Sequence, residues 1–385
     1  MPWSEMTRMQ ERRRFIEALE SCEYTMTELC AAFGIARKTG YKWAERYARE
    51  GWPGLEDRSR APRSCPHATE QCCVEALLED RRLHPRWGPR KLLARLRRRH
   101  PDWSWPAVST AGAVLRRHGL VLPRQRRARS PSAAGKPIVS AFEPNDVWTA
   151  DFKGEFRLGN RQLCYPLTVV DLVSRYLLDC RARESVAIAA AQPVFENLFR
   201  TYGLPQAILC DNGGPFAAYR APRRLSRLSV WWIRLGIEPI FIQPGHPEQN
   251  GAHERLHRTL KAETARPPRE NFDAQQGAFD DFGHEYNFER PHEALKLTMP
   301  AEHYHRSTRP YPERLPKLEY PGHFEVRRVS SKGTISWRQQ RLFLSESLIR
   351  TEVGLEEVDD GLWSIYLADT LLARYDDRDG GLQCL

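Results

Sequence analysis

Residues 147–154 read VWTADFKG, a largely apolar run that leads to a single acid, Asp151. Two further stretches carry an acid in a comparable place: LCDNGGPF at 209–216 contains Asp211, and PGHPEQNGAHERLHRTLK at 244–261 contains Glu254. The first two acids end strand-like runs, whereas Glu254 lies in the first turn of a predicted helix. Three carboxylates that converge in this way can hold two divalent cations about 3.5–4 Å apart. Such a pair clamps the attacking and leaving oxygens of an in-line phosphoryl transfer.

The region around these acids, residues 141–305, is predicted to be a mixed α/β domain. Apolar alternation predicts three consecutive strands, and alternating helices and strands follow them. The expected strands are 145–152, 162–171, 176–181, 207–210 and 238–242, and the expected helices are 187–202, 225–235 and 252–265. Trp231 and Trp232 are interpreted as core residues. Arg258 and Lys261 share the predicted helix face of Glu254 and could meet DNA phosphates.

The N-terminal residues 1–62 are predicted to form a helix-turn-helix domain. Residues 27–34 read as a short helix with Thr27 as its N-cap and Gly34 as its turn, and residues 36–48 read as a second helix. Residues 51–64 are turn-rich and are predicted to be a linker. The side chains of the second helix that could face a DNA groove are Arg37, Lys38, Thr39, Lys42 and Arg46.

Residues 66–122 are predicted to form a second unit resembling a helix-turn-helix, with helices at 70–82, 88–99 and 106–117. Pro106 suits the first turn of its helix, and Gly119 suits a C-cap. From residue 81 to residue 129 there are 15 Lys or Arg and one acid, which is the footprint of a nucleic-acid-binding protein. Arg90 and Lys91 are candidate DNA contacts, and residues 123–140 read as a basic linker.

The C-terminal residues 315–385 are predicted to form a small antiparallel β-barrel. Its strands are expected at 323–329, 333–337, 341–344, 362–367 and 370–375. Residues 341–385 hold four Arg and ten Asp or Glu, although the chain as a whole has a net charge of +10. A protein-contact role is therefore at least as well supported for this region as DNA binding.

Composition narrows the class of protein further. The 385 residues are 41% apolar, which suits folded multidomain architecture, and no apolar stretch predicts a membrane span or a signal peptide. Nine cysteines without paired spacing indicate reduced thiols in a cytoplasmic compartment. Cys65, His67, Cys72 and Cys73 form a local cluster, but adjacent cysteines are poorly placed to share a zinc ion.

An ordered set of motifs resembles the insertion-sequence transposases of the DDE superfamily. The set covers residues 25–300 in the family's order, so it is far more specific than any single motif. The matching stretches are the GLEDRSRAP linker at 54–62, W-x-x-D at 148–151, D-x-x-S-R at 171–175, D-N-G-x-x-F at 211–216, H-P-x-x-N-G-x-x-E-R at 246–255 and Y-N-x-x-R-P-H-x-x-L-x-x-x-x-P at 286–300.

The resemblance implies a catalytic core like that of retroviral integrases, with a ribonuclease-H-like fold. Asp151, Asp211 and Glu254 match the family's catalytic and metal-binding triad. Two Mg²⁺ ions, for which Mn²⁺ substitutes, are the expected cofactors, because the ligands are carboxylate oxygens. Expected partners are double-stranded DNA, at the element ends and at the target, and further copies of the chain in a dimer or larger assembly. No membrane partner is expected.

Other acids and histidines compete for roles in this site. Glu248 leaves 36 residues between itself and Asp211, near the 35 often seen in the family, whereas Glu254 leaves 42. Glu254 is preferred because a helix fixes a ligand better than a loop does, and because TLK follows it closely. Asp171 and Asp179 are interpreted as structural or surface acids. The three histidines near Glu254 are His246, His253 and His257, and they are expected to lie at the surface or contact DNA. A catalytic base is the alternative role, but two-metal transfer can activate the nucleophile without one.

Two other functions fit parts of the pattern. A DNA-binding regulator with an inactive core would retain the helix-turn-helix units but would not need a complete triad. A nuclease of ribonuclease-H-like fold would need the triad but not the two N-terminal units. The preferred hypothesis is a transposase that binds terminal inverted repeats, cleaves DNA strands and transfers them to a target.

Overall fold

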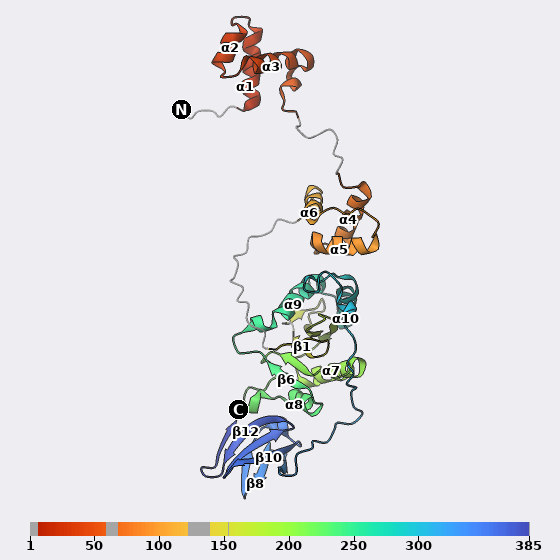
Figure 1. Cartoon of the computed structure of the whole chain (residues 1–385), viewed down its shortest axis with the longest axis vertical. Helices are drawn as coiled ribbons and strands as arrows, with labels where there is room; N and C mark the ends of the chain where they lie inside the picture. Colours follow the sequence, from red (N-terminus) through yellow and green to blue (C-terminus); the bar gives the residue numbers. More distant parts are fainter. Residues whose placement is uncertain (1–6, 59–67, 122–138, 153, 385) are drawn as a thin grey trace. The chain divides into compact units, whose positions relative to one another are not determined.

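The computed structural model describes residues 7–58, 68–121, 139–152 and 154–384. The chain forms two compact units, residues 1–68 and 69–385 (Figure 1). The α-helices are α1 (Arg8–Glu20), α2 (Met26–Ala32), α3 (Arg37–Glu50), α4 (Gln71–Leu83), α5 (Pro89–Arg99), α6 (Val108–Arg117), α7 (Ile188–Tyr202), α8 (Arg227–Arg234), α9 (Gly251–Thr264) and α10 (Phe272–His284). The strands are β1 (Val147–Phe152), β2 (Phe156–Arg157), β3 (Leu163–Asp171), β4 (Leu177–Arg183), β5 (Ala207–Cys210), β6 (Glu238–Phe241), β7 (Glu325–Arg328), β8 (Thr334–Trp337), β9 (Gln340–Phe343), β10 (Glu352–Asp359), β11 (Leu362–Leu367), β12 (Thr370–Asp376) and β13 (Gly381–Cys384).

The first unit is helical, as predicted, but its second helix begins earlier than expected. Thr25, not Thr27, is the N-cap of α2, because its hydroxyl accepts from the Glu28 backbone N–H while the Glu28 carboxylate accepts from the Thr25 N–H. This reciprocal capping box requires a Glu three residues after the cap. Gly34 has a φ of +64° and makes the predicted turn before α3.

The predicted linker at 51–64 is wrong in its first part. Residues Trp52–Leu55 form a short 3-10 helix, and Leu55 is fully buried in the core of the unit. The Arg12 guanidinium donates to the Leu55 carbonyl at 2.8 Å, which ties this turn to α1. Helix α1 itself was not predicted, since only Phe15 and Ile16 of its residues are buried.

Helices α4, α5 and α6 pack around Trp87, Leu92 and neighbouring apolar side chains. Helix α6 begins at Val108, so Pro106 precedes the N-cap Ala107 and does not lie in the first turn as predicted. Gly119 follows the last helical residues with a φ of +70°, as expected of a residue that ends a helix.

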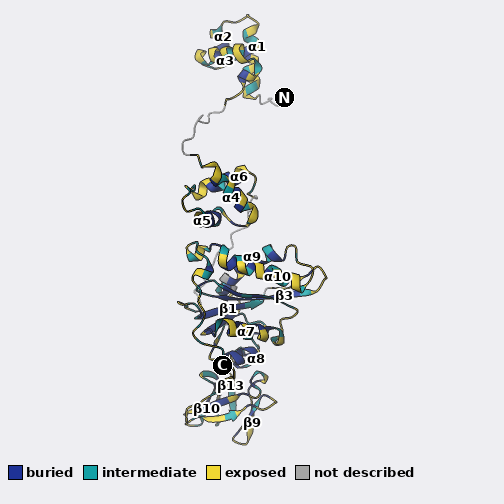
Figure 2. Ribbon diagram, turned by 90° about the vertical axis from the view of Figure 1, so that its right-hand side faces the viewer, coloured by how far each residue is buried: buried dark blue, intermediate teal, exposed yellow. Residues whose placement is uncertain are grey.

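The mixed sheet predicted for the central region is confirmed. Its strand order is β2-β3-β1-β5-β6, with β4 paired to β3. Strand β1 is antiparallel to β3 and parallel to β5, and β5 is parallel to β6. Helices α9 and α10 cover one face of this sheet and α7 covers the other, with the strands buried between them (Figure 2).

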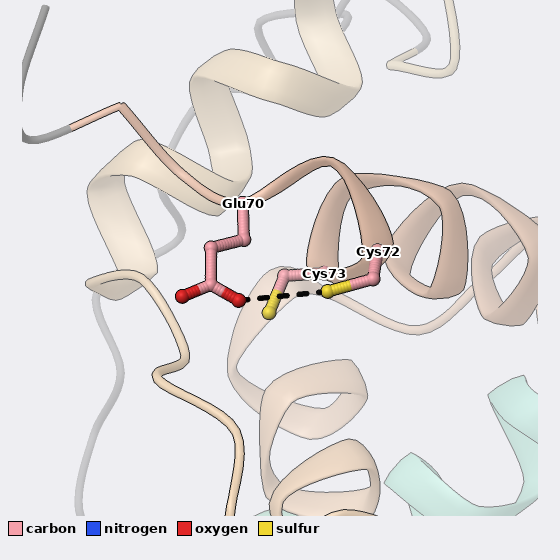
Figure 3. A group of neighbouring side chains, drawn as sticks. All are labelled: Glu70, Cys72 and Cys73. Atoms are coloured by element: carbon pink, nitrogen blue, oxygen red, sulfur yellow. Dashed lines mark hydrogen bonds between the residues drawn. The ribbon is translucent and has the colours of Figure 1, made fainter.

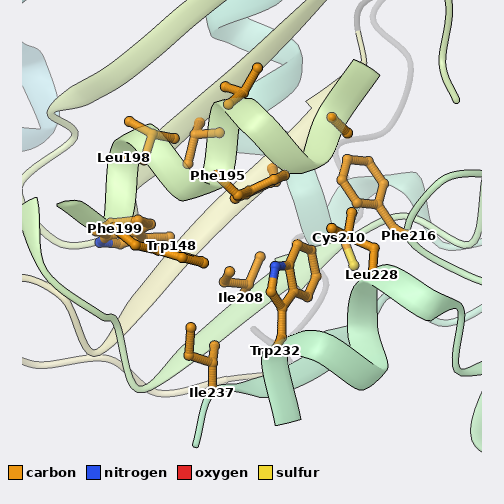
Figure 4. Close-up of a cluster of buried hydrophobic side chains, with 14 of the residues drawn as sticks. Trp148, Phe195, Leu198, Phe199, Ile208, Cys210, Phe216, Leu228, Trp232 and Ile237 are labelled. Atoms are coloured by element: carbon orange, nitrogen blue, oxygen red, sulfur yellow. The ribbon is translucent and has the colours of Figure 1, made fainter. Parts of the chain in front are cut away.

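Alternation along the strands separates the two faces. Trp148 and Ile208 point into the core beneath α7, where Phe195, Phe199 and Trp232 pack against them (Figure 4). The neighbours Thr149 and Thr168 therefore point toward α9 on the other face. The prediction that Trp231 and Trp232 are core residues is confirmed, since they are 8% and 0% exposed.

The C-terminal region is antiparallel, but the predicted small β-barrel is not confirmed. Five strands form a sheet in the order β13-β12-β11-β10-β7, and β8 and β9 form a separate hairpin. Strands β7 and β13 are not paired to each other, so the sheet is open. Apolar side chains of this sheet share a cluster with Val230 and Ile233 of α8.

Several element bounds differ by one to three residues from the predicted ones, and four α-helices or strands of unit two were not predicted: α10, β2, β10 and β13. Asp171 is structural, as interpreted: it is fully buried and accepts hydrogen bonds from the Asn145 and Ser174 backbone N–H groups at 2.7 and 2.8 Å. No helix among the described residues is both long and apolar enough to cross a bilayer.

Candidate functional site

Asp151 and Asp211 are neighbours because of the strand register. Strands β1 and β5 run parallel, and Ala150 lies opposite Cys210. The next residue on each strand is an acid, so the two carboxylates leave adjacent strands at the same edge of the sheet. Asp151 also lies on the sheet face of Thr149, which α9 covers.

The turn that carries Asp211 is held by local hydrogen bonds. The Gly213 backbone N–H donates to Asp211 Oδ1 at 3.1 Å, and the Asn212 amide donates to the Ile242 carbonyl at 2.7 Å. A Cβ at Gly213 would lie 3.1 Å from the Asp211 carboxylate. Burial raises the pKa of Asp211, so its charged form is less stable than that of an exposed acid. A cation at this edge of the sheet would favour the charged form.

Glu254 is exposed and lies in the first turn of α9. A carboxylate in this position also interacts favourably with the helix dipole. Helix α9 packs against β1, the strand that carries Asp151, through the residue before Glu254. The side chain of the rival acid Glu248 lies outside the described residues; its backbone is part of the short 3-10 helix Pro247–Asn250 that precedes α9.

Two histidines attach α9 to the sheet. His253 and His257 are 1% and 5% exposed. Nδ1 of His253 lies 2.9 Å from Thr149 Oγ1, and Nε2 lies 2.6 Å from Thr168 Oγ1. Burial lowers the pKa of His253 to about 3, so it is neutral and can donate through one ring nitrogen and accept through the other.

His257 completes this network. Its Nε2 lies 2.7 Å from the same Thr168 hydroxyl, and its Nδ1 lies 3.5 Å from Asp151 Oδ2. The prediction that His253 and His257 are surface or DNA-contacting residues is wrong. The sequence signal for this role was the i, i+4 spacing of the two histidines, which lie opposite threonines on β1 and β3. This signal can be recognised only when the pairing of the strands is known.

The three acids do not form a tight ligand cluster. Within the described residues, the group of potential ligand atoms that lie within 4.8 Å of one another is Glu70, Cys72 and Cys73 (Figure 3). Cys72 Sγ lies 3.6 Å from Glu70 Oε2, and burial raises the pKa of Cys73 to about 11, which disfavours a metal-binding thiolate. Cys65 and His67, the other members of the predicted cluster, lie outside the described residues.

The candidate DNA contacts of the first unit are largely accessible. Arg37, Lys38 and Lys42 are exposed on α3, and Thr39 is half-buried. Arg46 is half-buried and donates to the Glu56 carbonyl at 2.8 Å, so part of its guanidinium is used within the unit.

The remaining candidates lie on α5 and α9. Arg90 is exposed, and Lys261 is half-buried. Lys91 and Arg258 line one cavity of about 300 Å³ in the second unit. Three further cations that were quoted only as motif letters line the same cavity: Arg175, Arg255 and Arg290.

Family models match most of the chain in successive parts. Two models described as an integrase core domain match residues 141–247 and 235–300. A model described as a helix-turn-helix domain matches residues 11–63, and one described as a homeodomain-like domain matches residues 39–115.

Curated relatives include proteins of two bacterial insertion elements. A protein of insertion element IS476 from Xanthomonas euvesicatoria is 27% identical over 239 residues, which is 62% of this chain and 66% of the relative. A protein of insertion element IS407 from Burkholderia multivorans is 26% identical over 208 residues, which is 53% of this chain and 72% of the relative.

Solved structures with some likeness include a magnesium complex of the HTLV-2 integrase catalytic core domain, at 15% identity and a TM-score of 0.34, covering 43% of this chain and all of that one. An intasome of simian T-cell lymphotropic virus with a PP2A regulatory subunit matches at 17% identity and a TM-score of 0.37, over 69% of this chain and 90% of that one.

The family models and the insertion-element relatives agree with the ordered motifs of residues 25–300, and the paired acids of β1 and β5 lie within the matched core. Residues 141–300 therefore match the integrase core domain family, and the chain is similar to proteins of bacterial insertion elements.

Proposed function

We propose that this chain is a DNA transposase that binds terminal inverted repeats and carries out metal-dependent strand cleavage and strand transfer. The observation that carries the proposal is the parallel register of β1 and β5, which sets Asp151 beside Asp211. Helix α9 carries Glu254 and is attached to β1 and β3 through His253.

The donor set fits a hard divalent cation. Asp151, Asp211 and Glu254 offer carboxylate oxygens, which Mg²⁺ and Mn²⁺ prefer. The burial that disfavours the Asp211 charge is offset when a cation binds. Two Mg²⁺ ions held by these acids would activate the attacking oxygen and stabilise the leaving one.

The helix-turn-helix of the first unit supplies DNA recognition in this proposal. Helix α3 presents Arg37, Lys38 and Lys42 to solvent, and contacts of this kind position a protein on phosphates while a few side chains read bases. Two element ends must meet before they are joined, so the active species is a dimer or a larger assembly. A DNA substrate places the reaction at the bacterial nucleoid.

The direct test is strand transfer by the purified chain, with duplexes taken from the DNA that flanks its gene and with Mg²⁺ present. We expect Asp151→Asn, Asp211→Asn and Glu254→Gln each to reduce joining by at least about a hundredfold, because each removes a carboxylate charge from the metal site. Glu184→Gln, an exposed acid outside the site, is the matched control and is expected to join DNA like the parent.

The outcomes separate the rival hypotheses. Joining that survives all three triad substitutions contradicts the proposed mechanism, and loss with Glu248→Gln but not with Glu254→Gln reassigns the third ligand. Sequence-specific binding by a parent that never joins DNA with Mg²⁺ supports a regulator. Cleavage of RNA–DNA hybrids without any need for the repeats supports a nuclease.

A further inference from the structure

The cavity beside α9 is lined by cations from four separate segments. Lys91 comes from α5, Arg175 from the turn after β3, Arg255 and Arg258 from α9, and Arg290 from the segment after α10. Its volume is about 300 Å³. Glu293 is the acid among its lining residues.

Residues of three sequence motifs converge on this cavity, and the carboxylate site uses none of these residues. The D-x-x-S-R motif ends in Arg175, the Y-N-x-x-R-P-H motif contributes Arg290 and His292, and the residue after Glu254 in the H-P-x-x-N-G-x-x-E-R motif is Arg255. Arg175 reaches the cavity from a backbone with a φ of +63°, a conformation that costs free energy for a residue with a Cβ. The segments lie far apart in the sequence, so only the fold brings these side chains together.

The positive charge of the cavity is only partly compensated. Arg290 pairs with Glu263 at 3.2 Å. Lys91, Arg175 and Arg258 have no acidic partner within 4.0 Å among the described residues. Burial, and then the charge of Arg290, lowers the pKa of Lys91 to about 8, while Glu293 and Glu263 act in the opposite direction, so Arg290 and Lys91 repel each other. An anion bound among them would relieve this repulsion.

One buried ring nitrogen of a cavity-lining histidine also lacks a hydrogen-bond partner. Nε2 of His292 is inaccessible to solvent and has no hydrogen-bond partner among the described residues. The ring packs edge-on against Tyr286, with centroids 4.5 Å apart. A buried polar atom without a partner is costly, so a rotation of the ring that brought Nε2 to an oxygen ligand in the cavity would be favourable.

The position of the cavity indicates which anion it takes. Arg255 directly follows the candidate metal ligand Glu254. Arg258 lies about one helical turn from Glu254 along α9, at a rise of about 6 Å from that residue. Arginines that cannot lose their charge and present forked donors are suited to phosphate oxygens. We propose that this cavity binds one backbone phosphate of the DNA strand held at the carboxylate site, an inference that rests on the proposed transposase function.

A methylphosphonate scan in EDTA tests the proposal without the chemical step. Duplexes from the DNA flanking the gene would carry one neutral methylphosphonate at successive positions, and binding to the full chain would be measured. We expect one position at which the neutral linkage weakens binding by about tenfold. The same position should have no effect on Arg258→Ala, and the salt slope of that variant should fall by about one.

Arg227→Ala, which removes an exposed arginine from the first turn of α8, is the matched control and should keep the scan of the parent. Arg175→Lys is a second variant, which retains the charge but not the forked donor. In this variant the methylphosphonate at the same position should cause a smaller loss of binding than in the parent. Identical scans for the parent and Arg258→Ala, or an equal loss at every position, would overturn the proposal. So would competition by free inorganic phosphate without a position-specific effect.

Strand transfer on unmodified DNA distinguishes this result from failure of the proposed function. A parent that joins DNA but shows no cavity-dependent position retains the function and loses the cavity proposal. A parent that shows such a position but does not join DNA with Mg²⁺ retains the cavity proposal and loses the transposase activity.

Discussion

At the scale of single residues, the hydroxyl of Thr168 connects the sheet to the helix that carries Glu254. It lies 2.6 Å from His253 Nε2, 2.7 Å from His257 Nε2 and 3.2 Å from the Asp151 carbonyl oxygen. Thr168 is fully buried and lies opposite Asp151 in the antiparallel register of β1 and β3. One residue therefore couples the position of α9 to the strand of a candidate metal ligand.

Replacing Thr168 with the isosteric Val is predicted to lower the free energy of unfolding by about 1–3 kcal/mol, because buried ring nitrogens lose a partner without any change in volume. Thermal unfolding of the metal-free chain measures this as a lower midpoint. Thr370→Val is the control, since that hydroxyl makes no side-chain hydrogen bond among the described residues. An unchanged midpoint for Thr168→Val would show that the network adds no stability.

His292 is predicted to make stability depend on pH. Burial, with Lys91 and Arg290 nearby, lowers the pKa of His292 to about 3, whereas an unfolded histidine titrates near 6.5. The unfolded chain therefore binds more protons between these values. Neutral His292 makes its full contribution to the free energy of unfolding above about pH 6.5. This contribution is lost as the pH falls toward 3, and the loss is about 2 kcal/mol at pH 5.

Denaturant unfolding at pH 7 and pH 5 checks this expectation. His292→Gln should show a smaller loss between the two pH values than the parent, by about 2 kcal/mol. His284→Gln, a mostly exposed histidine on α10, should behave like the parent. Equal losses for all three proteins would exclude His292 as the source.

At the scale of elements, local pattern predicted strands and helices well where an apolar run or periodicity was clear. Strands β5 and β11 have the predicted bounds, and α3, α7 and α9 differ from them by only a few residues. Strand β10 was missed because it carries four acids, although β7 and β11 pair with it on both sides. Its assignment as a strand depends on pairing with β7 and β11, which the local sequence does not indicate.

The short helix after α3 gives a prediction at this scale. A Cβ at Gly54 would lie 2.5 Å from the Arg46 carbonyl oxygen, which belongs to the backbone of α3 and cannot rotate away. Gly54→Ala should therefore displace Leu55 from the core of the first unit and destabilise it by about 1–3 kcal/mol. Limited proteolysis of the full chain should show faster cleavage within residues 7–58.

Gly88→Ala is the control for this experiment, because a Cβ there would meet nothing within 4 Å. It should be cleaved at the rate of the parent. Equal rates for Gly54→Ala and the parent would mean that the turn moves without loss of packing.

At the scale of the whole second unit, α8 belongs to two cores. Leu228 and Trp232 pack in the core beneath the mixed sheet, while Val230 and Ile233 pack with the C-terminal sheet. This explains why the helix is apolar on most of its circumference. The acidic C-terminal region is thus attached to the domain of the mixed sheet through an apolar contact.

Removing residues 312–385 is predicted to cause aggregation, because it exposes Val230 and Ile233 together. Light scattering of the shortened chain should show large assemblies. Adding Val230→Lys and Ile233→Glu to the shortened chain should restore a soluble species, and the same pair in the full chain should destabilise it. A shortened chain that stays monodisperse would mean that the C-terminal sheet covers little apolar surface.

Neighbouring residues alone predicted most of the local elements, the basic N-terminal half and the identities of Asp151, Asp211 and Glu254 as candidate ligands, because apolar patterns, helix caps and motif order lie within short stretches of the chain. Tertiary structure alone decided which residues meet. The register of β1 and β5 pairs Asp151 with Asp211, and the cavity gathers Arg175 with Arg290. Such meetings depend on strand pairing and packing between distant segments, for which no single stretch of sequence carries a signal.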